Sequence, residues 1–284
     1  MRTKKSILCQ ATCNLVWRVM APLFVLTLLG ATHTTGLAAT EARPLQSDRA
    51  SEQLIQNYLT VTGLQKAQSP LLNLVARGTI KESTLLRNFI LIETADGKRH
   101  LTYHWTHLGR DHRVVFAYDG LQTWTQVLAP QQQEAQAYSG INSKHFASYR
   151  WLMQPFTLPT SADYVFQYKG NAKVGGRPAH AIKAYGKNNS PSWFYFDKDK
   201  SLLTRWGGLG ELAGTQVELD YQATQFKPVD GILLPSQIEL LAENAIYGRI
   251  KLEQISINQD LNDFSFYMPQ LHSPTLRQRP TVKD

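Results

Sequence analysis

Apolar and polar residues alternate along most of this chain, and the alternation limits it to a mainly β structure. The clearest case is the segment from Gln216, in which Val217, Leu219, Tyr221 and Ala223 are separated by polar residues only. Because successive side chains of a strand point to opposite faces, this segment predicts a strand with one buried and one solvated face. Such strands are typical of antiparallel sheets and not of buried parallel ones.

Glycine-containing turn signals separate the alternating segments. Asp96-Gly97, Asp119-Gly120, Gly175-Gly176 and Asp230-Gly231 offer residues that tolerate the positive φ of tight hairpins. Together the segments predict one long, strongly curved antiparallel sheet of about eleven strands. They lie near 72–81, 85–95, 99–108, 112–118, 121–128, 163–169, 178–186, 192–198, 202–206, 215–226 and 232–257, the last being a hairpin.

The final hairpin contains a change of phase. Ile246, Ile250 and Leu252 share one phase, whereas Ile255 and Ile257 share the other. One extra residue in the strand brings both sets to one face. A β-bulge is therefore expected at residue 253 or 254.

The first of two helices is predicted from Ser47 or Asp48, either of which suits an N-cap, to Thr62. Gly63 follows as the stop signal. Because its apolar residues share one face, this helix is expected to pack against an apolar surface. These residues are Leu54, Ile55, Tyr58 and Leu59.

The second helix is predicted from Asn142 to Gln154, immediately before Pro155. It carries a wide, mainly aromatic stripe. Ordinary core packing and a movable lid over a cavity both explain such a stripe, and the sequence leaves both open. The stripe comprises Phe146, Tyr149, Trp151, Leu152 and Met153.

Residues 1–39 have the organisation of a secretory signal peptide. Four basic residues accompany an apolar run from Val19 to Ala31, and small residues favour cleavage after Ala38 or Ala39. A membrane anchor is the alternative, but a spanning helix needs about 20 apolar residues. We therefore expect an exported, periplasmic protein with no integral membrane span after cleavage.

Cleavage changes what the rest of the chain can do. Both cysteines, Cys9 and Cys13, lie in the leader, so no disulfide and no cysteine-ligated metal is expected. The leader also holds four of the 30 Lys and Arg and none of the 22 acids, which lowers the net charge from +8 to +4. The remaining basic residues are scattered, so no nucleic-acid partner is expected. One domain over 47–269 is predicted, between a loose stretch at 40–46 and a loose tail at 270–284.

The sequence offers no clear metal centre. His100, His104, His107 and His112 are close in sequence, but on a strand residues 100 and 104 are about 13 Å apart, too far to share one ion. We expect them on the solvent face, and His145 on the surface of the second helix.

The sequence also lacks the common catalytic and cofactor-binding motifs. Gly207, Gly208, Gly210 and Gly214 resemble a phosphate loop, but a strand follows them instead of the helix N-terminus that binds phosphate. We predict a turn there, and no cofactor. Without a Gly-x-Ser-x-Gly, His-Glu-x-x-His or Ser-x-x-Lys motif, no enzyme is predicted. A hydrolase is the less favoured alternative. It stays open because a catalytic triad is recognised by its geometry and not by sequence position.

Nine short motifs, each a turn with hydrophobic residues, carry a family resemblance through their order and spacing. They are Tyr58–Gly63, Leu74–Gly78, Ala117–Trp124, Val174–His180, Phe194–Asp197, Leu202–Arg205, Val229–Pro235, Ile255–Asn258 and Phe264–Pro269. Over about 50–269 the chain resembles the outer-membrane lipoprotein-sorting proteins, similar in architecture to the periplasmic lipoprotein carrier and its outer-membrane receptor. The receptor's acylated N-terminal cysteine has no counterpart here.

The resemblance implies a mainly β (α+β) half-barrel, in which about eleven antiparallel strands curve round an apolar hollow that two or three helices plug. Carriers of this build shield lipoprotein acyl chains from water. The resemblance thus implies a non-enzymatic carrier whose partner is a lipid or a lipoprotein acyl chain, with envelope proteins as further partners. A protein-interaction or sensor module with a filled core is the alternative.

The inward phase of the strands and the second helix supply the expected lining of the hollow. Phe146 and Trp151 are expected to form its gate. The phase at Phe194 and Phe196 is open, because Trp193 and Tyr195 are also apolar. Packing in a solid core is the competing interpretation of all these residues. The expected lining is Leu101, Tyr103, Trp105, Phe146, Trp151, Phe194, Phe196, Val217, Leu219 and Tyr221.

Overall fold

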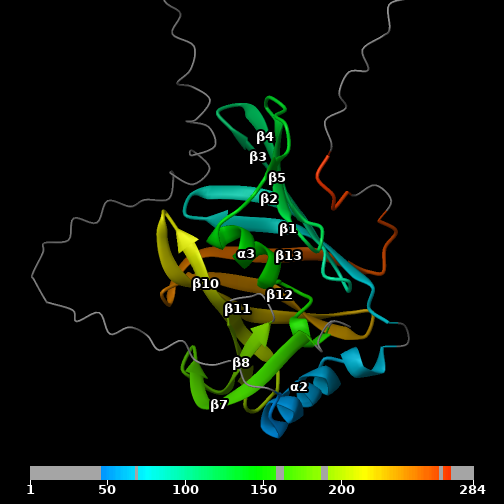
Figure 1. Ribbon diagram of the computed structural model, residues 1–284, viewed down its shortest axis with the longest axis vertical. Coiled ribbons are helices and arrows are strands. Elements are labelled where there is room, and N and C mark those ends of the chain that lie inside the picture. The colour runs from blue at the N-terminus through cyan, green and yellow to red at the C-terminus, as the bar shows by residue number, and fades with distance from the viewer. Residues whose placement is uncertain (1–45, 68–69, 158–162, 187–190, 262–264, 270–284) are drawn as a thin grey trace, which may run out of the picture.

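In the residues that the structure describes, the fold is a single open antiparallel sheet with two α-helices on its inner side (Figure 1). The computed structural model describes residues 46–67, 70–157, 163–186, 191–261 and 265–269. The predicted signal peptide, residues 40–45 and the tail from 270 lie outside the described residues. In the described part, the sheet has 13 strands in the order β6-β5-β4-β3-β2-β1-β13-β12-β11-β10-β9-β8-β7.

The predicted number of about eleven strands was too low. The two-residue β6 was not foreseen, whereas the two strands in the segment 232–257 agree with the predicted hairpin. The strands are β1 (Asn73–Glu82), β2 (Leu85–Thr94), β3 (Arg99–His107), β4 (Arg110–Tyr118), β5 (Thr123–Ala129), β6 (Gln136–Ala137), β7 (Tyr164–Val174), β8 (Arg177–Gly186), β9 (Ser192–Asp197), β10 (Leu203–Leu212), β11 (Thr215–Val229), β12 (Ile232–Ala242) and β13 (Ala245–Ile257).

All four predicted hairpin turns are present, and their second residues Gly97, Gly120, Gly176 and Gly231 have positive φ. The turn predicted for Gly207, Gly208, Gly210 and Gly214 is present only at Gly214, which has positive φ between β10 and β11. The other three glycines lie inside β10, so the prediction was wrong for them. Their role is close packing rather than unusual φ. A Cβ at Gly208 would overlap the Tyr149 hydroxyl, and one at Gly210 would lie 3.0 Å from Leu219 Cγ.

The predicted bulge lies in β13. Arg77 of β1 pairs with Gln254 and Gly78 pairs with Leu252, so Glu253 is the extra residue. Ile250, Leu252 and Ile255 are consequently buried in the same core. Ile246 was expected on that face but is exposed, because a second register shift separates the pairs Leu240–Gly248 and Leu241–Ile246.

The first helix, α2 (Arg49–Val61), agrees with the prediction at both ends. Asp48 is its N-cap and accepts a hydrogen bond from the Ser51 amide at 2.8 Å. Its other carboxylate oxygen accepts the amide of Tyr168 on the edge strand β7 at 2.7 Å. The cap therefore also covers part of a sheet edge that otherwise lacks a partner strand.

The second helix, α3 (Ile141–Ser148), is shorter than the predicted span of 142–154. The chain leaves the helix at Tyr149 and continues through a buried bend to the short 3-10 helix η2 (Pro155–Thr157). Another 3-10 turn, η1 (Leu64–Lys66), follows α2. No helix in the described ranges is long and apolar enough to cross a membrane.

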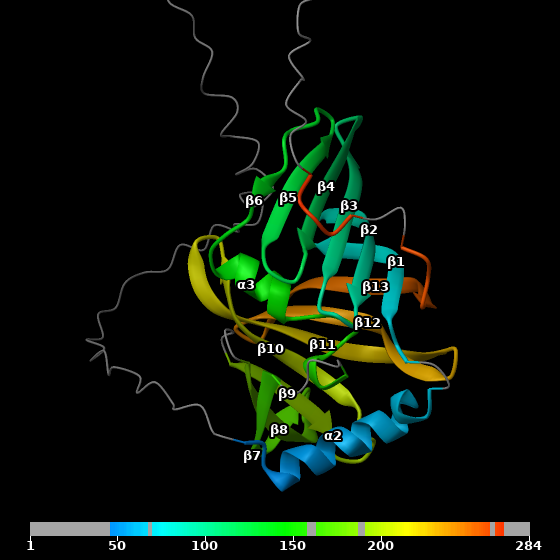
Figure 2. The same cartoon turned by 45° about the vertical axis from the view of Figure 1, so that its right-hand side comes forward.

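The sheet curves around α3. This helix contacts both β5 and β10, which lie far apart in the strand order (Figure 1). At the other end of the sheet, α2 packs against β7 (Figure 2). Between the helices, the ring of Phe156 packs against Tyr58 and Phe194 with centroids 5.4 Å apart in each case. The α2 end of the inner face is therefore filled by side chains.

Candidate functional site

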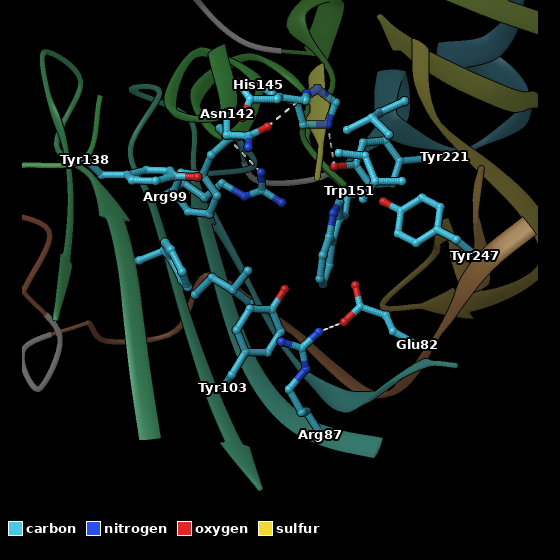
Figure 3. Close-up of a pocket in the computed structure, with 16 residues that line it drawn as sticks. Glu82, Arg87, Arg99, Tyr103, Tyr138, Asn142, His145, Trp151, Tyr221 and Tyr247 are labelled. Carbon is cyan, nitrogen blue, oxygen red and sulfur yellow. Dashed lines mark hydrogen bonds and ion pairs between the residues drawn. The ribbon is translucent and has the colours of Figure 1, made fainter. Parts of the chain in front are cut away.

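The α3 end of the inner face contains a cavity of about 170 Å³. Figure 3 shows Arg99 and Tyr138 across this space from Glu82 and Tyr247. Side chains from β1 to β4, β10, β11, β13 and α3 contribute to it, together with Tyr138 and Trp151. Its lining is Glu82, Arg87, Arg99, Leu101, Tyr103, Phe116, Tyr138, Asn142, His145, Phe146, Trp151, Glu211, Leu212, Leu219, Tyr221 and Tyr247.

The bend after α3 is held over the sheet by one buried carboxylate. Glu93, at the end of β2, accepts the backbone amides of Trp151, Leu152 and Met153 at 2.8–3.0 Å. Glu93 is 0 % exposed. Because these amides are bound by a side chain, they are not available for the helical bonds that would extend α3. Glu93 thus explains why the predicted helix ends early.

The carbonyls of the same segment are bound by a buried arginine. Arg99 of β3 donates from Nη1 to the carbonyls of Phe146 at 2.8 Å and Tyr149 at 3.1 Å. Its Nε lies 3.2 Å from Glu93 Oε1. The guanidinium carbon lies 4.6 Å from the ring centroid of Phe146 and 5.3 Å from that of Trp151. Arg99 therefore fixes the position of both predicted gate residues.

Another arginine, Arg150, anchors the bend from the outside of the cavity. It is buried and donates to the carbonyls of Thr94, at 3.0 Å, and of Gly97. Its own carbonyl accepts the indole N–H of Trp206 at 2.7 Å. The backbone of this irregular segment is therefore satisfied by side chains, as burial requires.

His145 closes one side of the cavity and was predicted wrongly as a surface residue. It is buried because α3 packs against β10, and its Nε2 lies 3.0 Å from the Tyr221 hydroxyl. Burial lowers the pKa of His145 to about 4. The imidazole is therefore neutral at pH 7, and burial likewise raises the pKa of Tyr221.

The opposite wall combines an ion pair with tyrosines. Arg87 is buried and paired with Glu82, and its guanidinium carbon lies 4.6 Å from the Tyr103 ring centroid. Burial lowers the pKa of Arg87 and raises the pKa of Tyr103 and of Tyr247. Their phenol groups are therefore neutral at pH 7. This wall offers neutral aromatic surface with polar edges.

Six of the ten side chains that the sequence predicts as ligand-lining come together around the cavity, and four do not. Phe194 and Phe196 belong to the filled core around Phe156. Trp105 stacks on His112 in the β3–β4 hairpin, at a centroid distance of 5.0 Å. Val217 is half-buried in β11, beyond the cavity. The six around the cavity are Leu101, Tyr103, Phe146, Trp151, Leu219 and Tyr221.

The charged lining residues were missed, although a signal existed. Arg99 shares the inward phase of Leu101 and Tyr103, and Arg87 shares the phase of Phe89. A charged residue in a buried phase is rare unless it is paired, and so it marks a polar site inside a core. The alternation of apolar residues does not reveal these arginines, because they count as polar in that pattern.

His100 was also expected on the solvent face and is buried instead. Its Nδ1 lies 3.0 Å from the Ser265 carbonyl, where residues 265–269 cover the outer face of β3. In the part of the chain that the structure describes, no three His, Cys, Asp or Glu side chains are grouped as a metal site requires.

The comparisons with known proteins give structural matches only. No protein-family model matches the chain, and no curated protein matches it. A putative outer membrane lipoprotein-sorting protein domain from Vibrio parahaemolyticus is similar in structure, with 11% identity and a TM-score of 0.47 over 74% of this chain and 95% of that chain.

Two further solved structures are similar at the same level. A LolA superfamily protein from Nitrosomonas europaea has 11% identity and a TM-score of 0.46, covering 75% of this chain and 95% of that one. A DUF1329 family protein from Desulfovibrio piger has 13% identity and a TM-score of 0.44, covering 76% and 97%. All three TM-scores lie below 0.5, so the functional argument rests on the residues of this chain.

Proposed function

We propose that this protein is an exported, non-enzymatic binding protein that holds the apolar part of a ligand in the cavity under α3. The observation that carries the proposal is the cavity itself, which lies between α3 and the inner face of the curved sheet. Aromatic and aliphatic side chains dominate its lining, and each CH₂ group moved there from water gains about 0.8 kcal/mol. A lipid or a lipoprotein acyl chain supplies such groups.

The volume of the cavity limits the size of the ligand group that it can hold. A cavity of 170 Å³ is close to the engineered apolar cavity of about 150 Å³ that binds benzene. It accommodates the end of an acyl chain and not a whole one. If the protein carries lipoproteins or lipids across the envelope, most of a long acyl chain must then be shielded from water by something other than this cavity.

The direct test titrates toluene, a neutral apolar probe small enough for the cavity, into the purified protein and follows binding by calorimetry. We expect saturable binding, and competition for the same site by a medium-chain alcohol. Leu219→Phe fills part of the cavity and should weaken toluene binding about tenfold. Phe194→Leu is the matched control, because Phe194 lies in the filled core and should leave binding unchanged.

Absence of saturable toluene binding, or equal weakening by both substitutions, contradicts the proposal. The interaction-module alternative then gains support, since the remainder of the inner face is filled.

A further inference from the structure

A polar corner of the cavity has more donors than acceptors. Arg99 Nη2 has no hydrogen-bond partner, although the Arg99 side chain is only 1 % exposed. Nη1 is used by two carbonyls, and Nε faces Glu93. In Figure 3 the guanidinium reaches into the space between Tyr138 and Trp151. A buried donor without an acceptor is costly, so this corner suits a ligand that brings one.

Trp151 provides a second buried donor without an acceptor at the same corner. Its Nε1 is buried and lies toward the Tyr221 hydroxyl, but it forms no hydrogen bond of acceptable geometry. The Tyr221 hydroxyl is already 3.0 Å from His145 Nε2. One indole N–H group, from Trp151, and one guanidinium N–H group, from Arg99, thus border the cavity without a hydrogen-bond acceptor.

The pairing of the lining charges also singles out this corner. Arg87 and Glu82 pair with each other. Arg99 faces one carboxylate, Glu93, which also accepts three backbone amides. Glu211, the remaining acid of the lining, is half-buried. Arg99 is therefore the lining cation whose carboxylate partner is shared with other donors.

We infer that the ligand is an amphiphile with a small anionic head, of which a carboxylate is the simplest, and that Arg99 Nη2 binds this head while the apolar chain occupies the rest of the cavity. The inference rests on the proposed function and specifies its ligand. A charged acceptor satisfies the free donor with a stronger hydrogen bond than a neutral acceptor forms. Nη2 donates a hydrogen bond to one carboxylate oxygen of the ligand, and the ring centroids of Phe146 and Trp151 lie 4.6 and 5.3 Å from the guanidinium carbon.

The test compares octanoate with octanol by calorimetry at about pH 8, where the acid is ionised. The two ligands share one chain length and differ in the head. We expect octanoate to bind at least about tenfold more tightly, because a hydrogen bond to a charged group is worth more than a tenfold change in affinity. Equal binding, or tighter binding of octanol, overturns the inference and leaves the proposed function standing. Binding of neither overturns both.

A substitution then locates the head group. Arg99→Lys keeps the charge but lacks the Nη2 donor, so it should reduce the preference for octanoate to about threefold or less. Arg205→Lys is the matched control, since Arg205 pairs with Asp220 outside the cavity, and it should keep the full preference. An unchanged preference in Arg99→Lys overturns the assignment. If Arg99→Lys fails to fold, the comparison of octanoate with octanol on the unaltered protein decides alone.

Discussion

Glu93 connects the sheet to the segment that roofs the cavity. Its carboxylate accepts three consecutive backbone amides of that segment and also faces Arg99, and both side chains are buried. A carboxylate held in this way is satisfied by its amides even without the arginine. Arg99, in contrast, depends on Glu93 to balance its charge. Loss of the acid therefore leaves a buried and uncompensated cation.

We expect Glu93→Gln to lower the free energy of unfolding by about 3–5 kcal/mol, because breaking a buried ion pair from one side has that cost. Denaturant unfolding followed by circular dichroism measures the change. Glu239→Gln is the control, since Glu239 pairs with the exposed Arg249 and should cost less than about 1 kcal/mol. Similar losses for both variants contradict the assigned role of Glu93.

His145 makes the stability depend on pH. Its pKa is about 4 in the folded protein against an ordinary 6.5, so between these values the unfolded chain binds more protons. The stabilisation is fully present above pH 6.5 and is lost as the pH falls toward 4. Arg99 and Tyr221 face the imidazole, and protonation there also adds a positive charge beside Arg99.

We therefore expect the unaltered protein to lose about 3 kcal/mol more than His145→Gln when the pH falls through this window. Thermal or denaturant unfolding of both proteins at a series of pH values measures the difference. Other titrating groups, such as Asp220 and His100, are present in both proteins and cancel in the comparison. Parallel pH profiles would contradict the shift at His145.

The elements differ in how far the sequence determines them. Hairpins were predictable because a two-residue turn with positive φ and the alternation around it are local properties, as at Gly97 and Gly120. The bulge at Glu253 was predictable for the same reason, since the phase change is visible within one strand. The N-cap Asp48 was foreseen as one of two adjacent candidates.

Elements that depend on distant partners were predicted less well. Residues 149–153 carry a helical pattern, but Glu93, 58 residues before Trp151, binds their amides and stops the helix. The glycines of β10 signal a turn in isolation, whereas their purpose is to let Tyr149 and Leu219 approach the strand closely. In both cases a tertiary contact overrides local propensity.

At the scale of the molecule, curvature makes the cavity. The sheet is one continuous ladder, yet α3 contacts both β5 and β10, so strands distant in the ladder face each other across the helix. The α2 end is filled by the rings around Phe156, and the α3 end is left partly empty. Alternation indicated which residues face inward. It did not indicate where the inner face is filled, which explains why Phe194 and Phe196 were grouped with the cavity residues.

The volume of the cavity determines how affinity should depend on chain length. In a series of linear carboxylates, each added CH₂ should strengthen binding about fourfold while the cavity fills, and further CH₂ groups should add little. We expect this plateau because Glu93 and Arg99 hold the roof of the cavity in place, and calorimetry across the series measures it. Leu219→Phe should reach the plateau at a shorter chain, since Leu219 lines the cavity. An even rise in affinity up to hexadecanoate would instead show that α3 and the bend move aside, and the movable-lid interpretation of residues 142–154 would then replace that of a fixed cavity.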